Sequence, residues 1–297
     1  MLFHLRLLLI ATGFIFLLAA AFPALADTES ALLKRRAQEE LTADNPFVIT
    51  PHKTNYLLPY TYNSHPNTGP YSVGTEDIDN VEIKFQFSFK LPLIKDIFHN
   101  NGTLFFAYTN LSFWQAYNKD ISSPFRETNH EPELFLNVEN DWKILGMTNR
   151  TNGFGIVHQS NGQSGTLSRS WNRVYGLFLL DRGNLVLAFK PWYRIPEDEK
   201  SSPTDPAGDD NPDIHKFLGY GEIYAFYKWE RQTLGLMVRN NLRSHDNKGA
   251  VQVDWTFPIS RRLKGYVQYF NGYGESLIDY NSSVNRIGLG VLLTDWL

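Results

Sequence analysis

The segment VEIKFQFSFKL, residues 81–91, alternates apolar and polar side chains without interruption. Successive side chains of a β-strand point to opposite faces, so this segment predicts a strand with one apolar and one polar face. The apolar side chains are those of Val81, Ile83, Phe85, Phe87, Phe89 and Leu91. A strand of a soluble sandwich could show this pattern, but its length also suits the ~9 to 11 residues with which a tilted strand crosses a bilayer.

Segments with a period of two recur from Pro46 onward, although most alternate less cleanly. We expect twelve strands, near residues 54–62, 81–93, 103–117, 132–140, 142–158, 170–180, 184–195, 217–229, 233–242, 249–258, 263–271 and 285–295. An even number suits an antiparallel sheet that closes on itself. In lipid the sheet has to close, because an open edge leaves backbone donors and acceptors unpaired in hydrocarbon.

The lengths of the expected connections test this interpretation. A bacterial barrel with both termini in the periplasm has long outer loops and short inner turns. The odd-numbered connections are almost all long and cover roughly residues 63–80, 118–131, 159–169, 196–216, 243–248 and 272–284. The even-numbered connections are mostly short and cover residues 94–102, 141, 181–183, 230–232 and 259–262. The sequence therefore predicts an all-β fold, a twelve-stranded antiparallel transmembrane β-barrel of the bacterial outer membrane.

The N-terminal residues predict export. Arg6 precedes an apolar run, and Ala24-Leu25-Ala26 matches the A-x-A cleavage site of a secretory signal peptide. A membrane-spanning helix is the alternative, but the run is short and ends at Pro23. We expect residues 1–26 to be a signal peptide, residues 27–45 a periplasmic extension with a charged helix over ALLKRRAQEEL, and residues 46–297 the barrel.

The composition excludes several classes of function. The chain has 0 cysteines, so neither a disulfide framework nor a thiolate site is available. Its 28 basic and 31 acidic residues are interspersed and give a net charge of −3, which predicts no binding to nucleic acid. Aromatic residues make up 14% of the chain, a share that suits sheet surfaces and membrane interfaces alike.

The segment GIVHQSNGQSGTLSRSWNR, residues 155–173, separates His158 from Ser160 by one residue. On a strand these side chains share one face, with Cα atoms roughly 6.5 to 7 Å apart, so the imidazole can reach the serine hydroxyl. This is the pairing of general base and nucleophile that acyl transfer uses. Asn172, at the start of the next strand, can accept the imidazole N–H through its side-chain carbonyl.

The spacing alone leaves a simpler alternative open. Asn161-Gly162 is a favoured turn pair, and Ser, Gln and Thr commonly fill outer loops. The G-x-S-x-G elbow is absent around Ser160, and the sequence contains no H-E-x-x-H helix of a metalloprotease.

Several motifs together resemble the outer membrane phospholipase A family. They are H-x-S-N-G at His158 to Gly162 with SRSWNR at 168–173, SSPFRETNHEPELF at 122–135, KPWY at 190–193, DDNPDI at 209–214 and GYGESLIDYN at 272–281. The resemblance covers nearly the whole chain from Pro46 and favours catalysis over a polar turn.

The resemblance implies a calcium-dependent phospholipase that is active as a homodimer in the outer membrane. Its substrates would be glycerophospholipids, cleaved at the sn-1 or sn-2 acyl ester, and lysophospholipids. By likeness, Ser160 is the nucleophile, His158 the base and Asn172 the group that orients the base. The Gly162 amide would contribute to the oxyanion hole together with a water bound to calcium.

The resemblance also implies the calcium ligands, which map to Ser122, Ser168 and the backbone carbonyl of Gln163. The family pattern has arginine where Gln163 stands. A backbone carbonyl can still bind calcium after that change, but the charge of the arginine, and any electrostatic role of it, is lost. A glutamine of the family's dimer interface is replaced by Asn110, which puts that interfacial hydrogen bond in doubt.

Strand alternation predicts which way this site faces. Asn172 shares its face with Val174, Gly176, Phe178 and Leu180, whereas Trp171, Arg173 and Tyr175 lie on the other. An apolar face suits lipid, so we expect the site on the outside of the barrel, near its outer rim, where it can reach acyl esters in the leaflet. Oxygen ligands from loops 118–131 and 159–169 would then converge only when calcium is bound.

The remaining motifs give weaker indications of function. The segment Asp205 to Asp213 contains Asp209, Asn211 and Asp213 at alternate positions as in an EF-hand. However, Ile214 replaces the glycine and Tyr220 the bidentate glutamate, so we expect a solvated outer loop. GYGESLIDYN lacks the lysine and helix of a phosphate cradle, and KPWY suits an interface belt.

Two further hypotheses remain at this point. One is a passive barrel, either a pore or a structural membrane protein. The other is a soluble exported sandwich.

Overall fold

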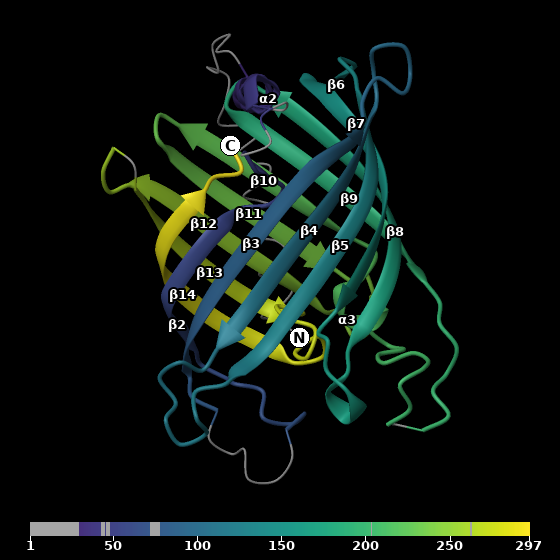
Figure 1. Cartoon of the computed structure of the whole chain (residues 1–297), viewed down its shortest axis with the longest axis vertical. Helices are drawn as coiled ribbons and strands as arrows, with labels where there is room; N and C mark the ends of the chain where they lie inside the picture. The colour runs from purple at the N-terminus through teal and green to yellow at the C-terminus, as the bar shows by residue number, and fades with distance from the viewer. Residues whose placement is uncertain (1–29, 43–44, 46–47, 72–77, 203, 262) are drawn as a thin grey trace.

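The computed structural model describes residues 30–297 apart from 43–44, 46–47, 72–77, 203 and 262. Within these residues, twelve strands of nine to fifteen residues form a closed antiparallel barrel (Figure 1). They are β2 (Asn55–Asn63), β3 (Val81–Ile94), β4 (Thr103–Trp114), β5 (Phe125–Glu139), β7 (Met147–Ser160), β8 (Ser170–Arg182), β9 (Leu185–Ile195), β10 (Gly221–Trp229), β11 (Gln232–Asn240), β12 (Gly249–Pro258), β13 (Lys264–Tyr273) and β14 (Ser283–Thr294). Because β14 pairs with β2, the sheet has no open edge among the twelve, and the predicted fold class is confirmed. The expected signal peptide, residues 1–26, lies outside the described residues.

Three strands, β5, β7 and β10, begin four or more residues from where the sequence prediction placed them. The strand expected over 142–158 is divided, because Leu145 and Gly146 both have positive φ and turn the chain between β6 (Lys143–Ile144) and β7. The strand expected over 217–229 begins instead with helix α3 (His215–Leu218), which Gly219, at φ 67°, ends before β10. Another short strand, β1 (Thr50–Pro51), pairs with β3.

The third difference concerns β5, which begins at Phe125 although residues 118–131 were expected to be a loop. The first half of this strand carries Glu127, Asn129 and Glu131, which are buried. Because these inward side chains are polar, the segment lacks the apolar alternation that marks a strand in sequence. The strand continues here because its inward groups have partners inside the barrel, as in the hydrogen bond from Asn129 Nδ2 to Glu127 Oε1.

The polar face of β3 points into the barrel. Glu82 and Lys84 are each 2% exposed, whereas Phe87 and Leu91 on the opposite face are more than 40% exposed. Inside, the Lys84 ammonium lies 2.8 Å from Glu275, and Arg286 lies 2.8 Å from both Glu82 and Glu275. This part of the lumen is filled by ion-paired side chains, which argues against an open water-filled pore.

The two ends of the barrel differ in their connections. At one end, the long-loop end, the chain crosses between strands through residues 64–80, 115–124, 161–169, 196–220, 241–248 and 274–282. At the other, the short-turn end, it crosses through 95–102, 140–146, 183–184, 230–231 and 259–263. Figure 1 shows the short-turn end at the top, with α2 and β6, and the long-loop end at the bottom, with α3.

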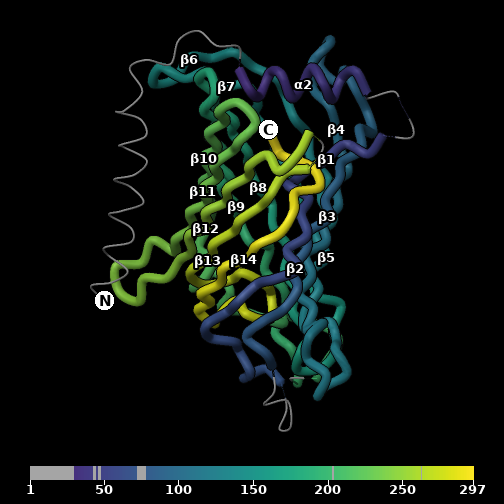
Figure 2. Tube along the Cα trace, turned by 90° about the vertical axis from the view of Figure 1, so that its left-hand side faces the viewer, coloured from purple at the N-terminus to yellow at the C-terminus, as the bar shows by residue number. Residues whose placement is uncertain are grey.

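Helix α2 (Ala31–Thr42) lies across the short-turn end (Figure 2). Ala31 and Leu32 are buried against Leu179, Val186, Ala188 and Leu297. The Arg35 guanidinium donates to the backbone carbonyls of Trp296 and Pro51. The expected charged helix is therefore present, and it packs on the barrel through apolar side chains of its first turn and through polar contacts of Arg35.

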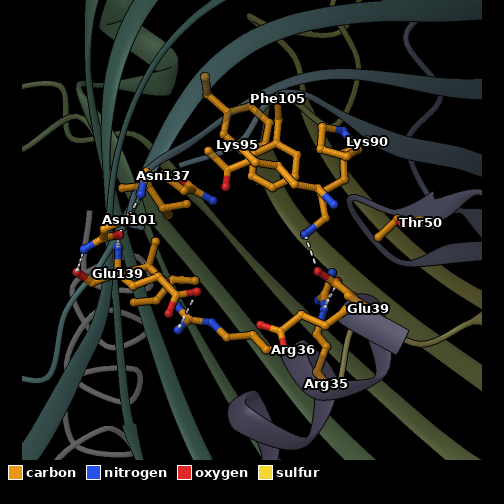
Figure 3. Close-up of a pocket in the computed structure, with 18 of the residues that line it drawn as sticks. Arg35, Arg36, Glu39, Thr50, Lys90, Lys95, Asn101, Phe105, Asn137 and Glu139 are labelled. Atoms are coloured by element: carbon orange, nitrogen blue, oxygen red, sulfur yellow. Dashed lines mark hydrogen bonds and ion pairs between the residues drawn. The ribbon is translucent and has the colours of Figure 1, made fainter. Parts of the chain in front are cut away.

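A cavity of about 380 Å³ lies between α2 and the barrel wall (Figure 3). The Glu39 carboxylate pairs there with Arg35 and with Lys90 of β3, each at 2.7 Å.

Within the residues that the structure describes, no helix is both long and apolar enough to cross a membrane.

Candidate active site

The β7–β8 hairpin holds most of the predicted site. In its register His158 is paired with Asn172, and Ser160 with Ser170. The connection begins at Asn161, whose backbone N–H donates to Arg169 O at 3.0 Å. A short 3₁₀ turn, η1 (Gly165–Leu167), follows within the loop.

The Asn161 side chain fixes the shape of this loop from inside the barrel. Its amide nitrogen donates to Leu167 O at 2.9 Å and to Glu127 at 3.2 Å, and its amide oxygen accepts from the backbone N–H groups of Gln163 and Arg169. Asn161 is buried, so these bonds are shielded from water. The turn next to Ser160 is thus held at both of its ends by one side chain.

His158 and Asn172 form a hydrogen-bonded pair on the outer face of the barrel. The imidazole Nδ1 lies 2.8 Å from the Asn172 amide oxygen. An amide oxygen only accepts hydrogen bonds, so Nδ1 carries the proton and, in the neutral ring, Nε2 is left as a base. His158 shares its strand face with Ile156, which is 49% exposed, whereas Trp171 beside Asn172 is 0% exposed.

Ser160 follows His158 by two residues on β7, so both side chains lie on the same face. In the described part of the chain no hydrogen bond joins the Ser160 hydroxyl to the imidazole. The structure therefore brings His158 and Asn172 into direct contact and leaves Ser160 adjacent to them. Hydrogen bonds of catalytic groups are often long before substrate binds and tighten in the complex.

Two residues beside these groups were not anticipated. Glu197, just beyond β9, accepts a hydrogen bond from Asn172 Nδ2 at 3.0 Å. His130 of β5 is paired with Ser160 in the β5–β7 register, and its Nδ1 lies 2.6 Å from the Tyr108 hydroxyl. His130 belongs to the SSPFRETNHEPELF motif, but the segment was expected to be a loop, so its position opposite Ser160 had no signal in the sequence.

Gly162 has the backbone conformation that an exposed tight turn requires. Its φ is +65°, which favours glycine, and the residue is exposed. A Cβ at this position would lie 3.8 Å from His130 Cδ2, an ordinary contact. The residue whose backbone amide is expected in the oxyanion hole therefore lies beside His130 and follows Ser160 by two positions.

The residues expected to bind calcium lie on two loops. Gln163 is exposed, and the Ser168 hydroxyl donates to Asp210 at 2.9 Å. Ser122 is exposed on the loop before β5 with φ 64°, and its backbone N–H donates to Lys119 O at 3.3 Å. Within the described residues, no hydrogen bond joins Ser122 to either of the other two.

Asp210 adds a carboxylate that the sequence prediction did not include. It accepts from the hydroxyls of Ser168 and Ser170, and Lys200 pairs with it at 2.5 Å. Hydroxyl, carbonyl and carboxylate oxygens are the hard donors that calcium prefers, so the Ser168 hydroxyl, the Gln163 carbonyl and the neighbouring Asp210 carboxylate are of the types that fit this ion.

The segment Asp205 to Asp213 was expected to be a solvated outer loop, and for its second half this is wrong. Asn211 is fully buried, and its side-chain oxygen accepts from the Ser170 backbone. Asp209 pairs with Arg194, and Asp213 accepts from the Tyr280 hydroxyl at 2.8 Å. Asn211 thus holds the loop against β8, Asp209 holds it against β9, and Asp213 holds it against the loop before β14.

Asn110 lies on β4, paired with the outward-facing Phe87 on one side and His130 on the other. Its side-chain oxygen accepts from the Ser112 hydroxyl at 2.9 Å. The residue expected at a dimer interface thus lies on the outer face, two strands from β7.

The closed antiparallel barrel, apolar outside and ion-paired inside, with long loops at one end, defines an outer-membrane β-barrel protein. The comparisons with known proteins then give the family. A family model described as phospholipase A1 matches residues 32–293. The chain belongs to the phospholipase A1 family.

Individual relatives cover most of the chain. The phospholipase A1 of Salmonella typhimurium is 40% identical over 254 residues, which are 85% of this chain and 83% of that protein. Two solved structures are similar to the present one. An active-site mutant of outer membrane phospholipase A from Escherichia coli, in which alanine replaces an asparagine, has a TM-score of 0.77 and 38% identity, covering 86% of this chain and 95% of that one. The outer membrane phospholipase dimer of Salmonella typhi with bound calcium has a TM-score of 0.78 and 38% identity, covering 87% and 96%. The fold and these relatives place the chain in a bacterial outer membrane.

Proposed function

We propose that the protein is a calcium-dependent phospholipase that cleaves the acyl esters of glycerophospholipids at the sn-1 or sn-2 position and also accepts lysophospholipids. The observation that carries this proposal is the His158–Asn172 hydrogen bond beside Ser160, on the lipid-facing side of the barrel. A triad in the lumen would serve a water-soluble substrate. Exposed apolar neighbours, Phe154, Ile156, Tyr193 and Ile195, instead suit acyl chains in the leaflet.

The chemistry follows from the tautomer of His158. The Ser160 oxygen attacks the ester carbonyl carbon while Nε2 takes the hydroxyl proton, and Asn172 holds the imidazolium in place. The Gly162 amide donates to the oxyanion of the tetrahedral intermediate. The acyl C–O bond then breaks, and His158 returns the proton to the departing glycerol oxygen. Water, deprotonated by His158, then attacks the acyl carbon, the bond from that carbon to the Ser160 oxygen breaks, and His158 returns the proton to Ser160 as the fatty acid leaves.

Calcium, when bound, would supply positive charge and a bound water close to the oxyanion. We propose Ser122, Ser168 and the Gln163 carbonyl as its ligands, with the Asp210 carboxylate, which is paired with Lys200, next to Ser168. The calcium in the Salmonella typhi structure supports the ion, and the asparagine of the Escherichia coli active site supports the role of Asn172.

The same Salmonella typhi structure is a dimer, which supports an active homodimer for this chain. Asn110 lies on the outer face, where a second barrel could contact it. Two adjacent barrels would enclose acyl chains between their apolar surfaces. We expect specific activity to fall when the protein is diluted in detergent, in parallel with the loss of a cross-linked dimer. Constant activity across the dimer–monomer transition would contradict this part of the proposal.

Replacement of Ser160 by alanine tests the catalytic proposal. We expect Ser160→Ala to fold as a barrel and to lose fatty-acid release from phospholipid micelles with calcium by roughly 10⁴-fold or more, since it removes the hydroxyl that would attack the ester. Ser244→Ala, an exposed serine of another outer loop, is the matched control and should keep full activity. Substrates labelled at sn-1 or sn-2 give the positional preference. Unchanged hydrolysis by Ser160→Ala would contradict the catalytic proposal and favour the passive-barrel hypothesis.

A further inference from the structure

Glu197 lies within hydrogen-bond distance of the Asn172 side-chain nitrogen. In the β8–β9 register Asn172 is paired with Ile195, and Glu197 follows two residues later on the same side. Pro196 between them restricts the backbone as it leaves β9. The Glu197 side chain is half-buried and accepts from Asn172 Nδ2 at 3.0 Å.

This contact decides which end of the amide faces the histidine. The oxygen and nitrogen of an asparagine side chain have nearly the same shape, so the amide can be turned by 180° at little steric cost. In the turned orientation, NH₂ would donate to His158 Nδ1 and the ring proton would move to Nε2. Nε2 would then be unable to accept the Ser160 proton.

A carboxylate prevents that exchange because it only accepts hydrogen bonds. With Glu197 ionised, the NH₂ end of Asn172 is held on the carboxylate, and the oxygen end is left for the imidazole N–H. In the described part of the chain no ion pair neutralises Glu197. The negative charge of Glu197 therefore lies on the far side of the neutral Asn172 amide from His158. From there it favours the His158 imidazolium that forms in the transition state.

We propose that Glu197 is a positioning residue of the hydrolase, which acts through Asn172 to select the productive amide orientation and the base tautomer of His158. This inference rests on the proposed function of Ser160, His158 and Asn172. It extends the site to a fourth side chain, contributed by the loop after β9.

Steady-state hydrolysis of phospholipid in mixed micelles, with saturating calcium and full-length variants, tests this role. We expect Glu197→Ala to lower kcat roughly 10-fold with KM nearly unchanged, because a charge-assisted hydrogen bond is lost away from the lipid. Glu197→Gln should recover part of kcat, since its carbonyl can still accept from Asn172. Glu199→Ala, an exposed acidic residue of the same loop, is the matched control.

A double-mutant cycle separates positioning from a general effect on the loop. If Glu197 acts through Asn172, Glu197→Ala should cause no further loss in an Asn172→Ala background. An equal loss in both backgrounds would overturn the inference, and so would a Glu197→Ala variant with wild-type kcat.

The calcium concentration for half-maximal activity should be the same in Glu197→Ala as in the wild type. A shift would show that Glu197 acts through the calcium loop instead and would also overturn the inference. These outcomes are distinct from failure of the proposed function itself, which would appear as activity retained by Ser160→Ala.

Discussion

The two faces of the β7–β8 hairpin have opposite characters. On the inner face, Val157, Trp171 and Tyr175 are at most 3% exposed and belong to one cluster of buried apolar side chains. On the outer face, His158 and Asn172 are hydrogen-bonded to each other and accessible from the membrane side. Since neighbouring residues of one strand serve the two faces, stability and catalysis should respond to different substitutions only one position apart.

The largest expected effect on stability is on the inner face. Trp171 is fully buried, with the Arg173 guanidinium 4.0 Å from its ring centroid and Trp192 at 6.1 Å. Trp171→Ala should lower the free energy of unfolding by about 3 to 5 kcal/mol, because it removes a large side chain from a packed cluster. Urea unfolding in detergent measures this, with Ser160→Ala as the outer-face control. A loss no larger than that of Ser160→Ala would contradict the separation of the two faces.

The adjacent residue should show the reverse pattern. Asn172→Ala removes the partner of His158 Nδ1 but no buried contact, so activity should fall roughly 10- to 100-fold. Its free energy of unfolding should stay within about 0.5 kcal/mol of the wild type. Fatty-acid release and urea unfolding of the same preparation provide both values. A variant that loses stability as well as activity would show that the outer pair also holds the hairpin together.

Gly162→Ala should have an intermediate effect. A methyl group finds room beside His130, so the cost comes from φ +65°, a conformation that disfavours alanine by about 1 to 2 kcal/mol. If the strain moves the amide away from the oxyanion position, activity should fall about 5- to 30-fold while KM changes little. Unchanged kcat would remove Gly162 from the oxyanion hole.

The sequence allowed the barrel to be predicted because lipid outside and ion pairs inside impose a period of two on strands such as β3. The proximity of His158 and Asn172 could also be predicted, since these residues lie on consecutive strands joined by one loop. Neither feature requires knowledge of distant segments.

The long-range contacts of the outer loops leave no periodic pattern in the sequence. The start of β5 was missed because Glu127 and Asn129 are polar yet buried by partners from other segments, including the backbone N–H groups of Ile278 and Leu277. Glu197 and Asp210 were missed for a related reason: their contacts with Asn172 and Ser168 depend on how residues 196–220 fold back onto the hairpin. Local periodicity carries no information on that path.

The smallest expected effect lies at the short-turn end, far from the hairpin loop. Burial alone would raise the pKa of the Glu39 carboxyl, but Arg35 and Lys90 outweigh it and lower that pKa below its ordinary value of 4.5. A carboxyl whose pKa is lowered by folding stabilises the folded state fully above its ordinary pKa. That contribution is lost as the pH falls through the folded-state value.

Glu39→Gln should therefore reduce the free energy of unfolding by about 1 kcal/mol at pH 7, and the difference from the wild type should vanish in acid. Glu40→Gln, exposed on the same helix, should show no such difference at either pH. Urea unfolding at both pH values measures the effect, and a difference that persists in acid would mean that Glu39 acts by packing instead of charge. Hydrolysis by Glu39→Gln should equal that of the wild type at pH 7, because α2 contacts the short-turn end of the barrel whereas Ser160 lies beside the long loops.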